Sequence, residues 1–145
     1  MKNKVFATVQ SNSFLILRLA LGIIFFAHGA QKLLGWFGGY GWTGTIGFFT
    51  QLGIPVALGG LAILTEFFGG IAIILGFLTR PAALGLVIVN LVAMTKVHWA
   101  NGFFLNGPNA GIEYVFALFM ISLFLLIKGA GSISIDQMIY ENVKK

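Results

Sequence analysis

Long apolar stretches separated by turn residues dominate the pattern along the chain. Each stretch is close to the roughly 20 residues that an α-helix needs to cross the hydrocarbon core of a bilayer. We expect four membrane spans, near residues 14–34, 54–78, 82–100 and 111–128. The predicted fold class is therefore all-α, an integral membrane bundle of four transmembrane helices that forms a single domain over residues 1–145.

Two short helices are expected outside these spans. Residues 35–53 carry no charge and are rich in glycine and aromatic residues, which indicates a loop followed by an interfacial helix over residues 43–52. After the fourth span, Ser134 and Gln137 have the spacing of a capping box. This spacing predicts a second amphipathic helix, in the C-terminal tail and on the bilayer surface.

The composition excludes several classes of protein. Of the residues, 58% are hydrophobic and 9% are charged, whereas a soluble domain has about 25% charged residues. The absence of cysteine excludes disulfides, thiolate metal sites and thiol-disulfide catalysis by this chain itself. Any redox role therefore needs a bound cofactor or substrate.

The basic residues indicate the topology. The net charge of +5 comes from lysines and arginines that flank the apolar segments, so we expect no nucleic-acid partner. The N-terminal lysines, Arg80 and Lys128 with the C-terminal pair belong on one side, which the positive-inside rule makes cytoplasmic. The intervening loops lack lysine and arginine and hold interfacial aromatics such as Trp36 and Trp99. We expect a multi-pass protein of the inner membrane, with both termini in the cytoplasm.

One face of the first span is polar. On a helical wheel, a face about 120° wide holds three polar residues, two glycines and one phenylalanine: Arg18, Gly22, Phe25, His28, Gly29 and Lys32. Since polar groups are costly in hydrocarbon, this face should look into the bundle, and the glycines allow close helix packing. The alternative is that Arg18 and Lys32 extend to opposite interfaces.

Glu66 lies near the middle of the second span. At a rise of about 1.5 Å per residue it is roughly 18 Å from either end of that span, so it must be paired or protonated. We expect a buried ion pair with Arg18, with His28 as a further partner. A purely structural pair is an equally good interpretation.

More polar residues gather near the outer ends of the spans. With the loop tryptophans they predict an apolar-walled pocket that opens outward and takes an amphipathic ligand with oxygen atoms in its head. A bound quinone fits because histidine and lysine can donate to its carbonyls, and a lipid headgroup or isoprenoid fits nearly as well. The candidate ligand-binding residues are His28, Lys32, Glu66, Lys96, His98, Glu113, Trp36 and Trp99.

Haem and zinc are disfavoured. His28 and His98 differ in depth by about 6 Å, judged from the helical rise, which opposes bis-histidine haem ligation. The histidines and carboxylates are too scattered for zinc. We expect no metal site and assign no catalytic residue.

The order and spacing of these motifs resemble the DoxX family of small membrane proteins, from about residue 13 to residue 137. Ala130 departs from the pattern, because the family often has proline there. The matching residues are Arg18-x3-Gly22, Phe25-x2-His28-Gly29-x2-Lys32-Leu33, Glu66-x2-Gly69-Gly70, Leu75-Gly76-x2-Thr79-Arg80, His98, Gly111-x-Glu113 and Gly129-x-Gly131-x2-Ser134-x-Asp136.

The resemblance implies a four-helix bundle but several functions. The family includes a subunit of a thiosulfate:quinone oxidoreductase and members linked to oxidative-stress or thiol redox complexes, while distant relatives act as cargo receptors or assembly chaperones. The leading hypothesis is a quinone-associated redox subunit with a redox-protein partner or a homo-oligomer, in which Arg18 fixes the charge of Glu66. The alternatives are a non-enzymatic scaffold, assembly factor or lipid-binding protein, or else a transporter, because fold kinship does not settle function.

Overall fold

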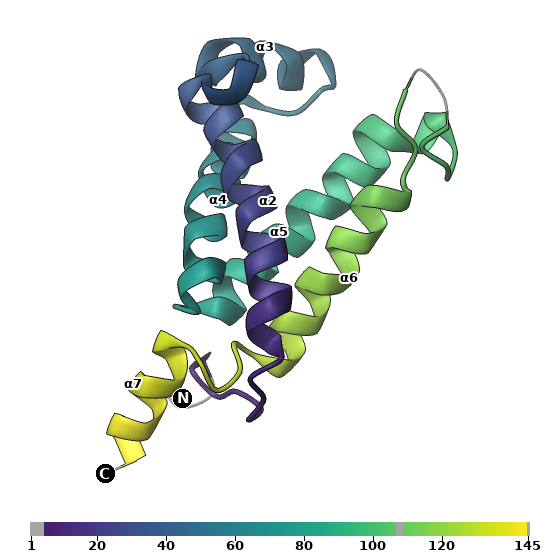
Figure 1. Cartoon of the computed structure of the whole chain (residues 1–145). Helices are drawn as coiled ribbons and strands as arrows, with labels where there is room; N and C mark the ends of the chain where they lie inside the picture. The colour runs from purple at the N-terminus through teal and green to yellow at the C-terminus, as the bar shows by residue number, and fades with distance from the viewer. Residues whose placement is uncertain (1–4, 107–108, 145) are drawn as a thin grey trace.

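The computed structural model describes residues 5–106 and 109–144, which are helical and contain no strand. Within these described residues, six α-helices are arranged as two hairpins with short helices at either end (Figure 1). Their bounds are α2 (Phe14–Leu34), α3 (Gly41–Gln51), α4 (Val56–Leu75), α5 (Thr79–Ala93), α6 (Glu113–Lys128) and α7 (Ile135–Lys144). The all-α class is confirmed, and three helical stretches of the described chain are long and apolar enough to cross a membrane: Phe14–Leu34, Val56–Leu75 and Thr79–Asn101.

The first hairpin is formed by α2 and α4, which run antiparallel in close contact. Glycines make this contact possible, because a β-carbon at Gly29 would collide with the backbone of Phe67. Likewise, a β-carbon at Gly70 would collide with the backbone of Phe26. The close helix packing expected from the polar, glycine-containing face of α2 is therefore present.

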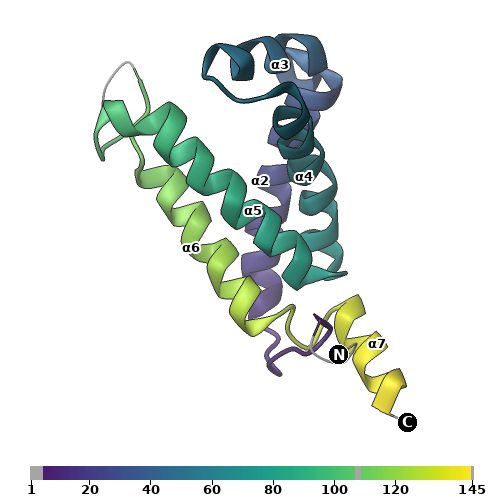
Figure 2. The same ribbon diagram turned by 180° about the vertical axis from the view of Figure 1, so that it is seen from behind.

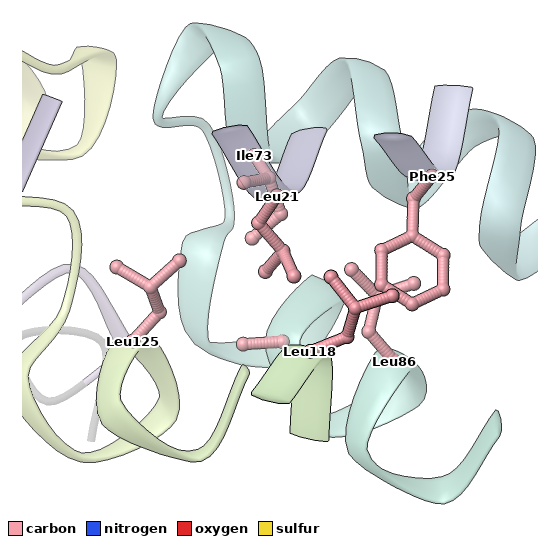
Figure 3. Packing of buried hydrophobic residues seen from close by; sticks show 7 residues of the cluster. Leu21, Phe25, Ile73, Leu86, Leu118 and Leu125 are labelled. Atoms are coloured by element: carbon pink, nitrogen blue, oxygen red, sulfur yellow. The ribbon is translucent and has the colours of Figure 1, made fainter. Parts of the chain in front are cut away.

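The second hairpin, α5 and α6, meets the first in an apolar core. Between α5 and α6, buried Asn90 donates a hydrogen bond of 3.4 Å to the hydroxyl of buried Ser122. The core between the hairpins contains the residues of Figure 3: Leu21, Phe25, Ile73, Leu86, Leu118 and Leu125. Figures 1 and 2 show that the hairpins converge at the end that holds both chain ends and diverge toward α3.

Several helix ends differ from the predicted ones. The second span, expected to end at residue 78, stops at Leu75, because Gly76 takes a left-handed conformation with φ 65°. The third begins at Thr79 rather than at residue 82, and Pro81 lies in its first turn. Proline is tolerated there because the amide groups of the first turn have no hydrogen-bond partner inside the helix. The connection between these two spans, which the expected bounds place at residues 79–81, therefore lies at residues 76–78.

The last two predicted spans also change at their ends. After α5, Met94–His98 form a π-helical turn and Trp99–Asn101 a 3₁₀ turn, which together continue the span to its expected outer end. α6 has 16 residues and begins at Glu113 rather than at the expected residue 111, because the residues before Glu113 fold back on the loop. The amide group of Glu113 donates to the carbonyl of Phe103 at 2.9 Å.

Both expected short helices are present. α3 covers Gly41–Gln51 where residues 43–52 were predicted. The amide group of Gln137 donates to the hydroxyl of Ser134 at 3.1 Å, so Ser134 caps α7 as the capping-box spacing predicted. The side chain of Gln137 does not complete the box and instead donates to Glu141 at 2.6 Å.

Candidate functional site

A cavity of about 1090 Å³ lies between α4 and α5, and we call it the α4–α5 cavity. α3 forms its outer wall, and the last turn of α2 contributes Gln31 and Lys32. Most of the remaining lining is apolar, including Leu61 of α4 and Ile88 of α5. The cavity is therefore an apolar space between the two hairpins, with a few polar groups in its wall.

The principal polar feature is an ion pair between Lys32 and Glu66. The Lys32 ammonium lies 2.5 Å from each carboxylate oxygen of Glu66. Glu66 is 3% exposed, whereas the side chain of Lys32 is 28% exposed. The Phe49 ring is also near, with its centroid 6.0 Å from Nζ, within cation–π range. The lysine thus supplies the counter-charge that a buried carboxylate requires and still faces the cavity.

The opposite wall carries Lys96 and His98. Both belong to the π-helical turn Met94–His98, and such turns are rare and often occur at functional sites. His98 is held by a contact of 2.8 Å between Nδ1 and the carbonyl of Ala110. The cavity lining therefore contains two lysines, one histidine and one glutamate, a surplus of basic groups.

Four of the eight predicted ligand-binding residues line this cavity: Lys32, Glu66, Lys96 and His98. The other four do not. His28 is exposed on α2, and Trp36 and Trp99 are exposed in the outer loops. Glu113 accepts a hydrogen bond of 2.9 Å from the amide group of Leu105, so it fixes the loop before α6.

The sequence did not predict that α3 forms a wall of the site. Buried Thr45 and half-buried Phe49 of α3 both line the cavity. A signal for this packing exists in α4, where side chains of α3 lie directly over a glycine pair. A β-carbon at Gly60 would come within 2.8 Å of the Trp42 ring, and one at Gly59 within 3.0 Å of the Phe49 ring.

The expected Arg18–Glu66 ion pair is wrong. Buried Arg18 donates from Nε to the carbonyl of Ile73 at 3.0 Å and from Nη2 to that of Ile74 at 2.9 Å. Its Nη1 donates to Ala130 at 2.9 Å and to Ile133 at 2.6 Å. Ile73 is two helical turns below Glu66, about 10 Å along α4. Arg18 therefore binds the end of α4, whose carbonyls lack partners inside the helix, and Lys32 pairs with Glu66 instead.

Other residues of the family-like motifs also fasten this end of the bundle. Arg80 donates to the carbonyls of Ala7 at 3.0 Å and Leu126 at 2.6 Å. Asp136 of α7 accepts the amide group of Thr79 at 2.9 Å and so caps α5 from another part of the chain. These three charged residues, Arg18, Arg80 and Asp136, form a structural group that we call the basal clasp.

A metal site has no support in the described part of the chain. In residues 5–106 and 109–144, no three side chains of histidine, aspartate or glutamate are grouped so that they could hold a metal ion. The α4–α5 cavity could instead hold an organic head, with Lys32, Lys96 or His98 as donors and Glu66 as acceptor.

Comparisons with known proteins agree with the membrane character of the fold. The family model described as DoxX matches residues 13–99. The chain is 29% identical over 131 residues to "Putative oxidoreductase CatD" of Bacillus subtilis (strain 168), an alignment that covers 90% of this chain and 89% of that protein. It is 34% identical over 127 residues to inner membrane protein YqjF of Escherichia coli (strain K12), covering 86% of this chain and 90% of that protein. No solved structure matches the chain significantly.

Proposed function

Because this chain belongs to the DoxX family of membrane proteins, we propose that it is a quinone-associated redox subunit of the inner membrane, with the quinone head in the α4–α5 cavity. One observation carries this proposal: the buried Lys32–Glu66 ion pair is set into the wall of a largely apolar cavity. A relative of similar length named as an oxidoreductase supports the redox part. Relatives named as inner membrane proteins support the location.

The polar groups suit both oxidation states of a quinone. An ammonium has three donors, so Lys32 can bind both oxygens of Glu66 and still donate to a ligand carbonyl. Reduction to the quinol turns each carbonyl into a hydroxyl, which can donate to the Glu66 carboxylate. The two electrons come from a redox partner protein and the two protons come from water, while this chain holds the head and supplies its hydrogen-bond partners.

The size and polarity of the cavity also fit. Small-molecule pockets typically enclose about 300–1,000 Å³ and are mainly apolar with a few placed polar groups. At about 1090 Å³, the α4–α5 cavity has room for a substituted ring and the beginning of its hydrocarbon chain. An aromatic side chain, Phe49, lies beside Lys32 and can contact the ring.

A thermal-shift experiment in nanodiscs tests this function. Decylubiquinone should raise the unfolding temperature of the wild type, and extraction of the purified protein should release quinone. The double variant Lys32→Met with Glu66→Gln removes both charges without leaving either one alone, and it should lose the shift. Lys128→Gln changes an exposed lysine outside the cavity lining and should keep it. A wild type that neither retains quinone nor responds to it contradicts the proposal.

The surplus of basic groups favours one second candidate, a non-enzymatic lipid-binding protein. Lys32, Lys96 and His98 face a single carboxylate, Glu66, and this balance suits an anionic lipid headgroup. Native mass spectrometry of the same nanodisc preparation separates the two candidates. A retained phospholipid in place of a quinone would favour lipid binding.

We further propose that α6 is a fourth span and that both termini are cytoplasmic. Its charged residues, Glu113 and Lys128, stand only at its ends, and it packs along α5. The start of α2, the start of α5 and the end of α6 lie toward the end of the bundle that holds both chain ends (Figure 1). These helix ends carry Arg18, Arg80 and Lys128; Lys2, Lys4 and Lys145 fall outside the described residues. A membrane-impermeant maleimide on intact cells should label Asn101→Cys and not Asn142→Cys. Labelling of both would refute this orientation.

A further inference from the structure

One side of the α4–α5 cavity is open, and the opening is apolar. Leu61 of α4 is 61% exposed and Ile88 of α5 is 54% exposed, although both line the cavity. Leu58 and Val92, which are also exposed, extend the same two edges toward α3. We call these four residues the lateral mouth.

The surroundings of the lateral mouth are hydrocarbon rather than water. Leu61 and Ile88 lie well inside helical stretches that can cross a membrane, Val56–Leu75 and Thr79–Asn101. At the outer end, α3 lies over the cavity, with Trp42 packed against the backbone at Gly60. α3 thus forms the outer wall of the cavity, whereas the way from the bilayer is lined by exposed leucine, isoleucine and valine.

The lower limit of the lateral mouth is also defined. α4 and α5 touch at Thr65 and Gly85, where a β-carbon on the glycine would lie 2.7 Å from the threonine methyl. Closer to the basal clasp, Gly69 stands against Leu86. Figure 2 shows the two helices crossing near this end and separating toward α3. A ligand held at Lys32 and Glu66 thus has an apolar way out above Thr65.

We propose that the α4–α5 cavity is loaded sideways from the bilayer, through the lateral mouth, by an amphiphile with a single hydrocarbon chain. Its oxygen-bearing head binds at Lys32 and Glu66, and its chain lies between Leu61 and Ile88 and continues into the lipid. This inference rests on the proposed function, because it specifies how a quinone reaches that site. It adds that the hydrocarbon chain is recognised as well as the head, since burial of apolar surface in the mouth contributes to binding.

The natural absence of cysteine allows the lateral mouth to be bridged selectively. The variant Leu61→Cys with Ile88→Cys is treated with a bis-maleimide in nanodiscs, and completeness is verified by mass. Decylubiquinone binding is followed by quenching of tryptophan fluorescence. The same double variant without the reagent is one control. The pair Ile16→Cys with Ile23→Cys, exposed on α2 and outside the cavity lining, is the other.

Bridging should slow decylubiquinone association by about tenfold or more relative to the same double variant before bridging, as expected when a gating segment is locked, while the treated Ile16→Cys and Ile23→Cys pair binds as the wild type does. The tailless head 2,3-dimethoxy-5-methyl-1,4-benzoquinone should bind the unbridged protein more weakly than decylubiquinone. Unchanged association after complete bridging overturns the lateral route and leaves the proposed function intact. Absence of saturable quenching in the wild type overturns the proposed function itself, and the route with it.

Discussion

Lys32 and Glu66 join the two helices of the first hairpin within the α4–α5 cavity, with the lysine Nζ 2.5 Å from both carboxylate oxygens. The pair is asymmetric, because Glu66 is almost completely buried while Lys32 keeps part of its surface open. Leaving a buried carboxylate without its partner costs more free energy than leaving a partly exposed ammonium without one. The stability of α2 against α4 and the chemistry of the cavity therefore depend on the same two side chains.

The first prediction concerns this dependence. Lys32→Met should lower the free energy of unfolding by about 3 kcal/mol, because it leaves the Glu66 charge buried without a partner. Adding Glu66→Gln should recover much of that loss, since the double variant has no charge to bury. Unfolding in mixed micelles, analysed as a double-mutant cycle, measures the coupling. Equal stability of the single and double variants would show that the pair is not a buried ion pair in the membrane.

The second prediction concerns the guanidinium of Arg18. Lysine keeps the charge but concentrates its donors on one atom, so it cannot bind carbonyls of α4 and of residues 130–133 together. Arg18→Lys should lower the free energy of unfolding by about 2–4 kcal/mol, as expected when buried acceptors lose charged donors. Hydrogen exchange should rise at residues 129–139 more than in the α4–α5 cavity. Lys128→Gln serves as the control, and a loss of equal size there would contradict the role of the basal clasp.

Elements set by local sequence could be predicted, and elements set by long-range packing could not. Hydropathy located the long apolar helices, glycine and aromatic content located α3, and the capping residue Ser134 located α7, because these signals act within one turn or one helix. The helical wheel placed Arg18 at the right azimuth and depth but could not show its partners. Those partners include the carbonyls of Ala130 and Ile133, two residues that follow α6. Because these partners are backbone groups, no sequence motif marks them.

The same reason explains which site residues were misplaced. A polar face on α2 was expected to look into the bundle, yet His28 is exposed. Figure 1 shows α5 and α6 diverging from α2 toward its C-terminal end, the part of α2 that carries His28. The divergence of the two hairpins is set by packing at their opposite end. The sequence of α2 therefore carries no periodic pattern that could reveal it. Lys32, one turn further on, reaches its partner because its longer side chain extends to α4.

The third prediction tests the capping of α5 by Asp136. Its two carboxylate oxygens accept the amide groups of Leu78 at 2.8 Å and Thr79 at 2.9 Å. Asparagine offers one acceptor oxygen, so Asp136→Asn should cost about 1–2 kcal/mol, the range known for helix caps. Hydrogen exchange of the Leu78 and Thr79 amides should quicken in this variant. Glu141→Gln, an exposed position in the same helix, should leave both amides protected; unaltered exchange in Asp136→Asn would exclude the cap.

The fourth prediction separates two kinds of glycine in the bundle. A β-carbon at Gly29 would overlap the backbone of Phe67, which cannot move without shifting α4, whereas one at Gly47 in α3 would meet nothing within 4 Å. Gly29→Ala should therefore force α2 and α4 apart and cost about 1–3 kcal/mol, as overpacking does. Gly47→Ala should be neutral or stabilising by up to about 1 kcal/mol, because alanine favours the helix. Thermal unfolding in nanodiscs measures both. Because Lys32 follows Gly29 by one turn on α2, separation of the helices should also weaken the Lys32–Glu66 pair, so Gly29→Ala should reduce the quinone-induced shift. A Gly29→Ala protein as stable as the wild type would show that the close contact of α2 and α4 does not persist in the bilayer.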